Sequence, residues 1–200
     1  MYFAFKYPAM LMKYRPVATL VGAALFHLAV SAQTPAQGGF RSDVQKIVED
    51  YPHEFAAIRG RVIDKSPQTM EFASSVKPEG SLETSVTRYS SSGRAVYSWQ
   101  SVLLRTDDYE AAAKKYKWVF SQLKGMNVTY VIDKYTLKGS FQSPDESRNF
   151  SSSDLELAAP PDPLRKLRVR VQLQYEMPEW KVSLMVFEKD REDQDMASSD

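Results

Sequence analysis

The sequence contains no cysteine, and this absence excludes several classes of protein. Without thiols the chain cannot form a disulfide framework, a thiolate metal site, a cysteine nucleophile or a lipid-modified N-terminal cysteine. Histidine is almost as scarce, because His27 and His53 are the two copies. His53 has no second histidine or fixed carboxylate pattern around it, so we predict a surface residue, no metal site and no cofactor.

Motifs for catalysis and for nucleotide binding are also missing. There is no G-x-S-x-G motif, and the serines cluster in runs that are typical of turns. The stretches "LKGSF" and "AQGGF" lack the glycine count and the context of a phosphate-binding loop. Four carboxylates are candidates for the acid pair of a glycoside hydrolase, and no spacing singles any of them out: Glu71, Glu83, Asp107 and Asp133. The sequence therefore favours a protein without enzymatic activity and identifies no catalytic residue.

No apolar run is long enough to remain as a membrane anchor. The longest run, over 17–30, has about 14 residues where a membrane-spanning helix needs about 20. Residues 1–32 combine this run with three basic residues and no acidic one, which is the pattern of a signal peptide. We predict cleavage after Ala32 and export of the chain from Gln33 onward to the periplasm or the cell exterior.

Two alternatives stay open at the N-terminus. Translation from Met12 would give a more ordinary signal peptide with a short basic start. The apolar run could also be an uncleaved signal anchor or a buried helix, although its length argues against both.

The chain that remains after cleavage is close to neutral. The full sequence has 26 basic and 25 acidic residues, and loss of the three basic residues in 1–32 leaves 23 against 25, a net charge of −2. This balance argues against nucleic acid as a general partner. About 168 residues remain, which is enough for one domain with a hydrophobic core and too few for two domains of ordinary size.

Hydrophobic periodicity predicts an α+β fold: two helices packed on an antiparallel sheet of six to eight strands. The clearest strands are 167–175 and 180–189, whose alternation predicts an antiparallel hairpin. We place a flexible lead-in at 33–40, a single domain at 41–189 and a disordered acidic tail at 190–200. The two halves can also be compared as a duplicated αβββ unit, although they do not align residue by residue.

Polar residues mark the predicted helix starts. Ser42 is suited to cap the first helix, which Pro52 ends or kinks. Asp107 and Glu110 have the spacing of a capping box before the second helix. The segment 142–166 is rich in serine, aspartate and proline, and we expect either a mobile or a functional loop there.

Two features are candidates for contact with a partner. Trp118 falls on the polar side of the second predicted helix, where it either packs under a loop or marks a binding surface. Lys166, Arg168 and Arg170 alternate along a predicted strand and would project together, near Lys181 of the next strand. This basic cluster is either a solvated sheet face or a site for an anionic surface or for the chain's own acidic tail.

The sequence thus favours an exported, non-enzymatic binding or adaptor domain whose partner is another protein or an envelope component. The alternatives are a small secreted hydrolase that uses carboxylates, and a structural or assembly protein of the envelope. A concave pocket with converging titratable groups would favour the hydrolase, and self-association would favour assembly.

Overall fold

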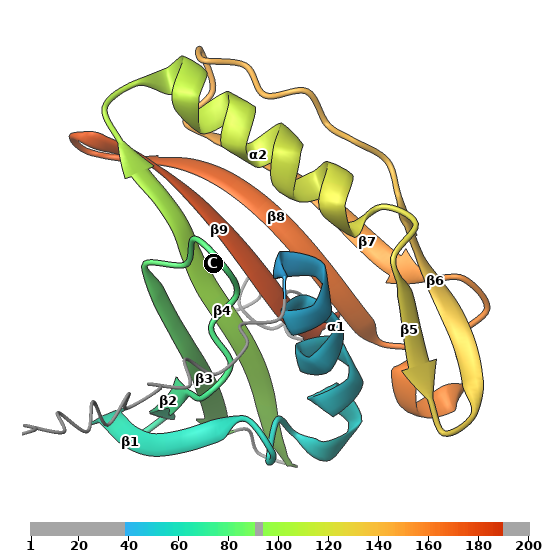
Figure 1. The fold of residues 1–200 in the computed structure, drawn as a ribbon. Helices are drawn as coiled ribbons and strands as arrows, with labels where there is room; N and C mark the ends of the chain where they lie inside the picture. The colour runs from blue at the N-terminus through green and yellow to red at the C-terminus, as the bar shows by residue number, and fades with distance from the viewer. Residues whose placement is uncertain (1–38, 91–93, 190–200) are drawn as a thin grey trace, which may run out of the picture. The chain divides into compact units, whose positions relative to one another are not determined.

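The computed structural model describes residues 39–90 and 94–189. The predicted signal peptide, nearly all of the predicted lead-in and the predicted tail at 190–200 lie outside these residues. The described residues form two α-helices, nine β-strands and two short 3₁₀-helices, η1 and η2 (Figure 1). Neither α-helix of this part of the chain has the length and apolar composition that crossing a bilayer requires.

The helices and strands confirm the predicted α+β class. They follow one another in the order α1 (Phe40–Asp50), η1 (Tyr51–His53), β1 (Arg59–Lys65), β2 (Thr69–Ser74), β3 (Glu83–Ser90), β4 (Ala95–Thr106), α2 (Tyr109–Leu123), β5 (Asn127–Tyr130), β6 (Asp133–Gly139), β7 (Phe150–Leu157), η2 (Asp162–Leu164), β8 (Leu167–Glu176) and β9 (Glu179–Glu188). The nine strands exceed the predicted six to eight.

All nine strands belong to one antiparallel sheet with the order β1-β2-β3-β4-β9-β8-β7-β6-β5. Each helix is followed by a meander, and the last strands of the two meanders, β4 and β9, pair at the centre of the sheet. Four strands follow α1 and five follow α2, so the predicted αβββ unit is wrong in its number of strands.

The β8–β9 hairpin defines two faces of the sheet. Alternate residues of β8 are buried, as the sequence predicts: Leu167, Val169, Val171 and Leu173. These residues lie on the inner face, on which α2 packs through its contacts with β4, β8 and β9. The opposite face, which carries Arg168 and Arg170, is called the open face below. The antiparallel pairing of β8 with β9, for example Val171 opposite Leu184, confirms the predicted hairpin.

Helix α2 buries one stripe of side chains, which are Ala112, Tyr116, Val119, Phe120 and Leu123. Full burial of each large apolar side chain contributes about 1.5–3 kcal/mol. The helix begins one residue later than the capping-box spacing predicts. Asp108, not Asp107, is the N-cap, because its Oδ1 accepts a hydrogen bond from the backbone N–H of Ala111 at 3.2 Å.

Helix α1 begins at Phe40, two residues before the predicted cap Ser42. Gly39 occupies the N-cap without a side-chain hydrogen bond, and burial of Phe40 stabilises the extra residues. At the other end of α1, Glu49 Oε1 accepts a hydrogen bond from the backbone N–H of Thr129 at 2.8 Å. Because Thr129 lies in the edge strand β5, this contact covers part of an otherwise open sheet edge.

Strand β7 lies within the segment 142–166 that was predicted to be a loop. Serines conceal the strand, because Ser151 and Ser153 take inward positions where a hydrophobic alternation is expected. Ser153 also binds α2, since the Tyr116 hydroxyl lies 2.6 Å from Ser153 Oγ in a buried hydrogen bond. The loop prediction is therefore wrong for β7, which joins β6 to β8 in the sheet.

Candidate functional site

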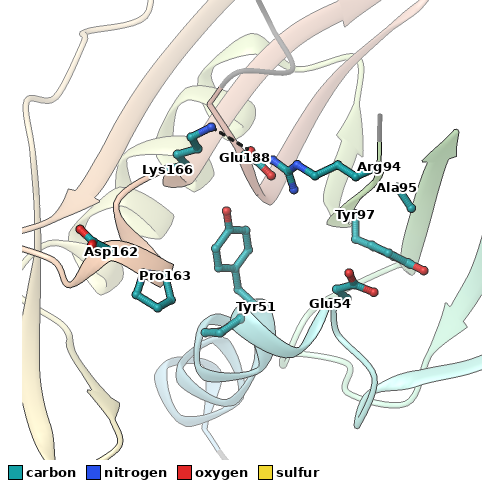
Figure 2. A pocket seen from close by; sticks show the side chains of 10 residues that line it. Tyr51, Glu54, Arg94, Ala95, Tyr97, Asp162, Pro163, Lys166 and Glu188 are labelled. Carbon is teal, nitrogen blue, oxygen red and sulfur yellow. Dashed lines mark hydrogen bonds and ion pairs between the residues drawn. The ribbon is translucent and has the colours of Figure 1, made fainter. Parts of the chain in front are cut away.

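A cavity of about 270 Å³ lies among η1, η2, the start of β4 and the end of β9 (Figure 2). The rings of Tyr51 and Tyr97 form an aromatic part of the wall. Charged side chains from four separate segments form the polar part. The charged residues are Glu54, Arg94, Asp162, Lys166 and Glu188. The cavity therefore gathers opposite charges around an aromatic centre.

Glu188 is the buried charge of this site. It continues the inward alternation of β9 after Leu184 and Val186, and its side chain is 8% exposed. A carboxylate at such a position needs partners, because burial without them costs several kcal/mol. Arg94 donates a hydrogen bond to Glu188 Oε1, and Lys166 Nζ lies 3.7 Å from the same oxygen.

The two cationic side chains are more exposed to solvent than the carboxylate that pairs with them. The side chain of Arg94 is 60% exposed and that of Lys166 is 52% exposed. Figure 2 shows both side chains converging on Glu188, with the Tyr51 ring pointing toward the same group. Glu188 therefore fixes two cations at the cavity while they remain accessible to solvent.

The wall that carries Glu54 has an unusual backbone. Glu54 and Phe55 both have a φ of 57°, in the left-handed region that side-chain-bearing residues rarely adopt. Such residues cost about 1–3 kcal/mol each and persist where the surroundings impose them, which is common at functional sites. The Phe55 side chain is fully buried and meets the Tyr51 ring edge-on, with 6.0 Å between centroids, so its packing offsets part of the strain.

Asp50 holds the same turn from the end of α1. Its Oδ2 accepts hydrogen bonds from the backbone N–H of Ala57 at 3.0 Å and of Ile58 at 3.2 Å. His53 is exposed, as predicted, and its Nδ1 lies 3.7 Å from Asp50 Oδ1. Asp50 is thus a positioning residue for the Glu54 wall of the cavity.

The opposite wall comes from the second part of the segment 142–166. Helix η2 places Asp162 and Pro163 at the cavity, and Asp162 forms an ion pair with Arg165 of the same turn. Lys166 follows directly and enters the site before β8 begins. This part of the predicted loop therefore helps to form the candidate site.

The structure separates the predicted basic cluster of Lys166, Arg168 and Arg170. Arg168 Nη2 lies 3.0 Å from Glu156, and Arg170 forms two hydrogen bonds of 2.6 Å with Asp154. Both arginines lie on the open face, whereas Lys166 turns to the cavity, because it precedes the strand and does not follow its alternation.

The open face consequently carries alternating charges. The acids of β7 lie opposite the arginines of β8, and the guanidinium of Arg170 also lies 5.0 Å above the ring of Phe187. Lys181, the predicted neighbour of the cluster, forms an ion pair with Glu176. Arg168, Arg170 and Lys181 are therefore paired within the sheet and do not form one continuous basic surface.

Trp118 packs against two neighbouring side chains. Its ring is 5.0 Å from the ring of Phe40, and Lys115 Nζ lies 4.5 Å from its ring centroid. Burial lowers the pKa of Lys115, and the negative charge of Glu79 opposes that shift. Trp118 nevertheless stays 40% exposed, so packing on α1 leaves part of the ring available for contact.

Sequence reasoning missed most of the cavity residues, because they come from segments that are distant along the chain. One signal was present in β9, where Glu188 occupies the inward position that follows Trp180, Val182, Leu184 and Val186. A charge at the end of an inward apolar series indicates a paired or functional group.

Metal binding finds no support within residues 39–90 and 94–189, which hold no group of three or more His, Asp or Glu side chains suited to a metal ion. Comparisons with protein-family models, with curated proteins and with solved structures find no match to this chain. No relative therefore supplies a role for the cavity residues.

Proposed function

We propose that this protein is an exported, non-enzymatic binding protein of the cell envelope or the cell exterior, with the cavity as its ligand site. The observation that carries the proposal is the arrangement of Glu188, a buried carboxylate that fixes two largely exposed cations at a concave surface. Side chains held in place before the ligand arrives lose less entropy on binding. The strained turn at Glu54 also supports a functional wall.

The secreted hydrolase is the weaker alternative for this cavity. Converging titratable groups are present, but the lining residues within 39–90 and 94–189 include no serine, threonine or histidine that could act as a nucleophile or base. Of the three carboxylates among these lining residues, Glu188 and Asp162 are engaged in ion pairs. An acid pair for glycoside hydrolysis needs two carboxyl groups that face the substrate, which this arrangement does not favour.

An assembly role has one observation in its favour. Val62 and Ile63 of the edge strand β1 are about half exposed, at 47% and 45%, and exposed edges can pair with another chain. Sedimentation at increasing protein concentration tests this second candidate. Concentration-dependent dimers that Val62→Lys abolishes would support assembly, and a constant monomer would exclude it.

Mass spectrometry of protein isolated from its native source tests the binding function. Wild type is compared with Ala95→Trp, which fills the cavity, and with Val96→Trp, a matched control whose side chain points to the other face of β4. We expect a small molecule to accompany wild type and Val96→Trp but not Ala95→Trp. Equal retention by all three, or none by wild type, would contradict the proposal.

The same measurement tests export. Cleavage after Ala32 would give protein whose intact mass corresponds to a chain that begins at Gln33, recovered from outside the cytosol. An intact start at Met1 or Met12 in cytosolic protein would contradict export and leave the cavity assignment standing.

A further inference from the structure

We infer that the cavity binds a zwitterionic ligand whose carboxylate and ammonium groups are separated by a short chain, such as an ω-amino acid or a dipeptide. The inference rests on the proposed function and names the ligand class of the same site. It follows from the way in which charges are distributed over the cavity walls.

The ligand carboxylate is assigned to Arg94 and Lys166. Both side chains line the cavity, are more than half exposed and are oriented by the same buried Glu188 oxygen. A guanidinium carries five N–H donors and an ammonium three, so a pairing with Glu188 does not exhaust either group. Hydrogen bonds between such cations and a carboxylate are among the stronger ones in proteins.

The ligand ammonium is assigned to Glu54. This residue lines the cavity from the turn after η1, and Figure 2 shows it on the η1 side, across from the Lys166 and Glu188 group. The left-handed backbone at Glu54 and the hydrogen bonds of Asp50 hold that turn in place. Glu54 therefore extends into the cavity lining from a turn whose backbone is held in place.

A ligand of one charge fits this lining poorly. A simple anion would meet Glu54, Asp162 and Glu188 in the same cavity, and a simple cation would meet Arg94 and Lys166. Like charges brought together at an interface cost several kcal/mol. A zwitterion satisfies both walls at once, which gives specificity through attraction and repulsion together.

The size and the walls of the cavity limit the connecting chain. A volume of about 270 Å³ lies near the lower end of the range of about 300–1,000 Å³ that is typical of small-molecule sites, so the cavity suits a small ligand. Tyr51, Tyr97 and Pro163 form apolar surface between the charged groups. A short methylene or peptide chain between the ligand charges would pack on this surface.

Isothermal titration calorimetry with the chain from Gln33 onward tests the inference, with 6-aminohexanoate as the probe. Hexanoate and hexylamine serve as probes that lack one of the two charges. We expect 6-aminohexanoate to bind at least about tenfold more tightly than either, because each of the other two probes lacks the charged hydrogen bonds at one end.

Three variants assign the two ends of the ligand. Arg94→Gln should weaken 6-aminohexanoate and hexanoate together, whereas Glu54→Gln should weaken 6-aminohexanoate about tenfold and leave hexanoate unchanged or tighter. Arg170→Gln on the open face is the matched control and should change neither. Thermal melts of each variant confirm that the protein is folded.

Two results would overturn the inference. One is equal affinity for hexanoate and 6-aminohexanoate, and the other is a Glu54→Gln variant that binds both probes like wild type. A third result separates the inference from the proposed function. If none of the probes binds, but a native compound accompanies wild type and not Ala95→Trp, the zwitterion assignment is overturned and the proposed function stands. Absence of both would count against the proposed function as well.

Discussion

Two carboxylate–cation groups on neighbouring strands of the sheet are built in opposite ways. On the open face Arg170 is the covered partner, at 16% exposure, and Asp154 is the exposed one, at 40%. At the cavity the carboxylate of Glu188 is covered and its cationic partners Arg94 and Lys166 are exposed. The first group presents an acid to solvent and the second presents two cations.

The difference shows that an ion pair's function depends on which partner is buried. A covered arginine with two hydrogen bonds to one carboxylate stabilises strand pairing and offers little to a ligand. A covered carboxylate does the reverse, because it orients two cations whose side chains stay more than half exposed. Three predictions test this comparison, and they are ordered from the largest expected effect to the smallest.

The largest effect is expected at the support of the cavity wall. Asp50→Ala removes the acceptor of two backbone N–H groups, at Ala57 and Ile58, and should lower the free energy of unfolding by about 2–4 kcal/mol. Urea denaturation measures the loss. Asp50→Asn is the control, because its amide oxygen can still accept a hydrogen bond. A loss below about 0.5 kcal/mol in Asp50→Ala would show that the turn at Glu54 does not depend on Asp50.

The next effect contrasts the two carboxylates directly. Glu188→Gln should lower the free energy of unfolding by about 1–2 kcal/mol, a value reduced because its cationic partners are solvent-screened. Asp154→Asn should cost less than about 1 kcal/mol, since the Asp154 carboxylate is exposed. Urea denaturation of both variants in one buffer makes the comparison. Equal losses would show that the burial of Glu188 has no energetic consequence.

The smallest effect is expected in the acid stability of a third pair, Glu176 with Lys181. The hydrogen bond from Lys181 lowers the pKa of Glu176 below its ordinary value of 4.5, burial opposes the shift, and the charges of Lys181 and Arg105 add to it. A lowered pKa in the folded state means stability that is present above pH 4.5 and is lost as the pH falls below that value. In Lys181→Gln the free energy of unfolding should fall less steeply below pH 4.5. Parallel profiles in wild type and variant would contradict this assignment.

Much of the fold could be predicted because its signals are local. The alternation of β8 and β9 and the apolar stripe of α2 each lie within one element and reflect a single buried side. Strand β7 escaped prediction, since serine at Ser151 and Ser153 hides the alternation and their burial depends on the neighbouring helix. The helix caps lie three residues before the predicted one in α1 and one residue after it in α2, because Phe40 and Asp108 respond to tertiary packing and cap geometry.

The candidate site could not be predicted in the same way. Lys166, Arg168 and Arg170 share one alternation in the sequence, yet Lys166 lies outside the strand and therefore turns to Glu188. Neither Trp118 nor the arginines line the cavity, whose lining comes instead from Tyr51, Glu54, Arg94 and their neighbours. Only one of the four predicted contact residues thus reaches the site that we propose.

The sequence by itself determined the α+β class, the last hairpin and the polarity of the two faces of β8 and β9, because burial of alternate side chains is decided between near neighbours. The tertiary structure alone decided where the charges meet. The cavity brings together η1, η2, the start of β4 and the end of β9, and contacts between such distant segments depend on the complete strand order. The strand order therefore decides which partner of an ion pair is buried. It also decides which charge a ligand can reach.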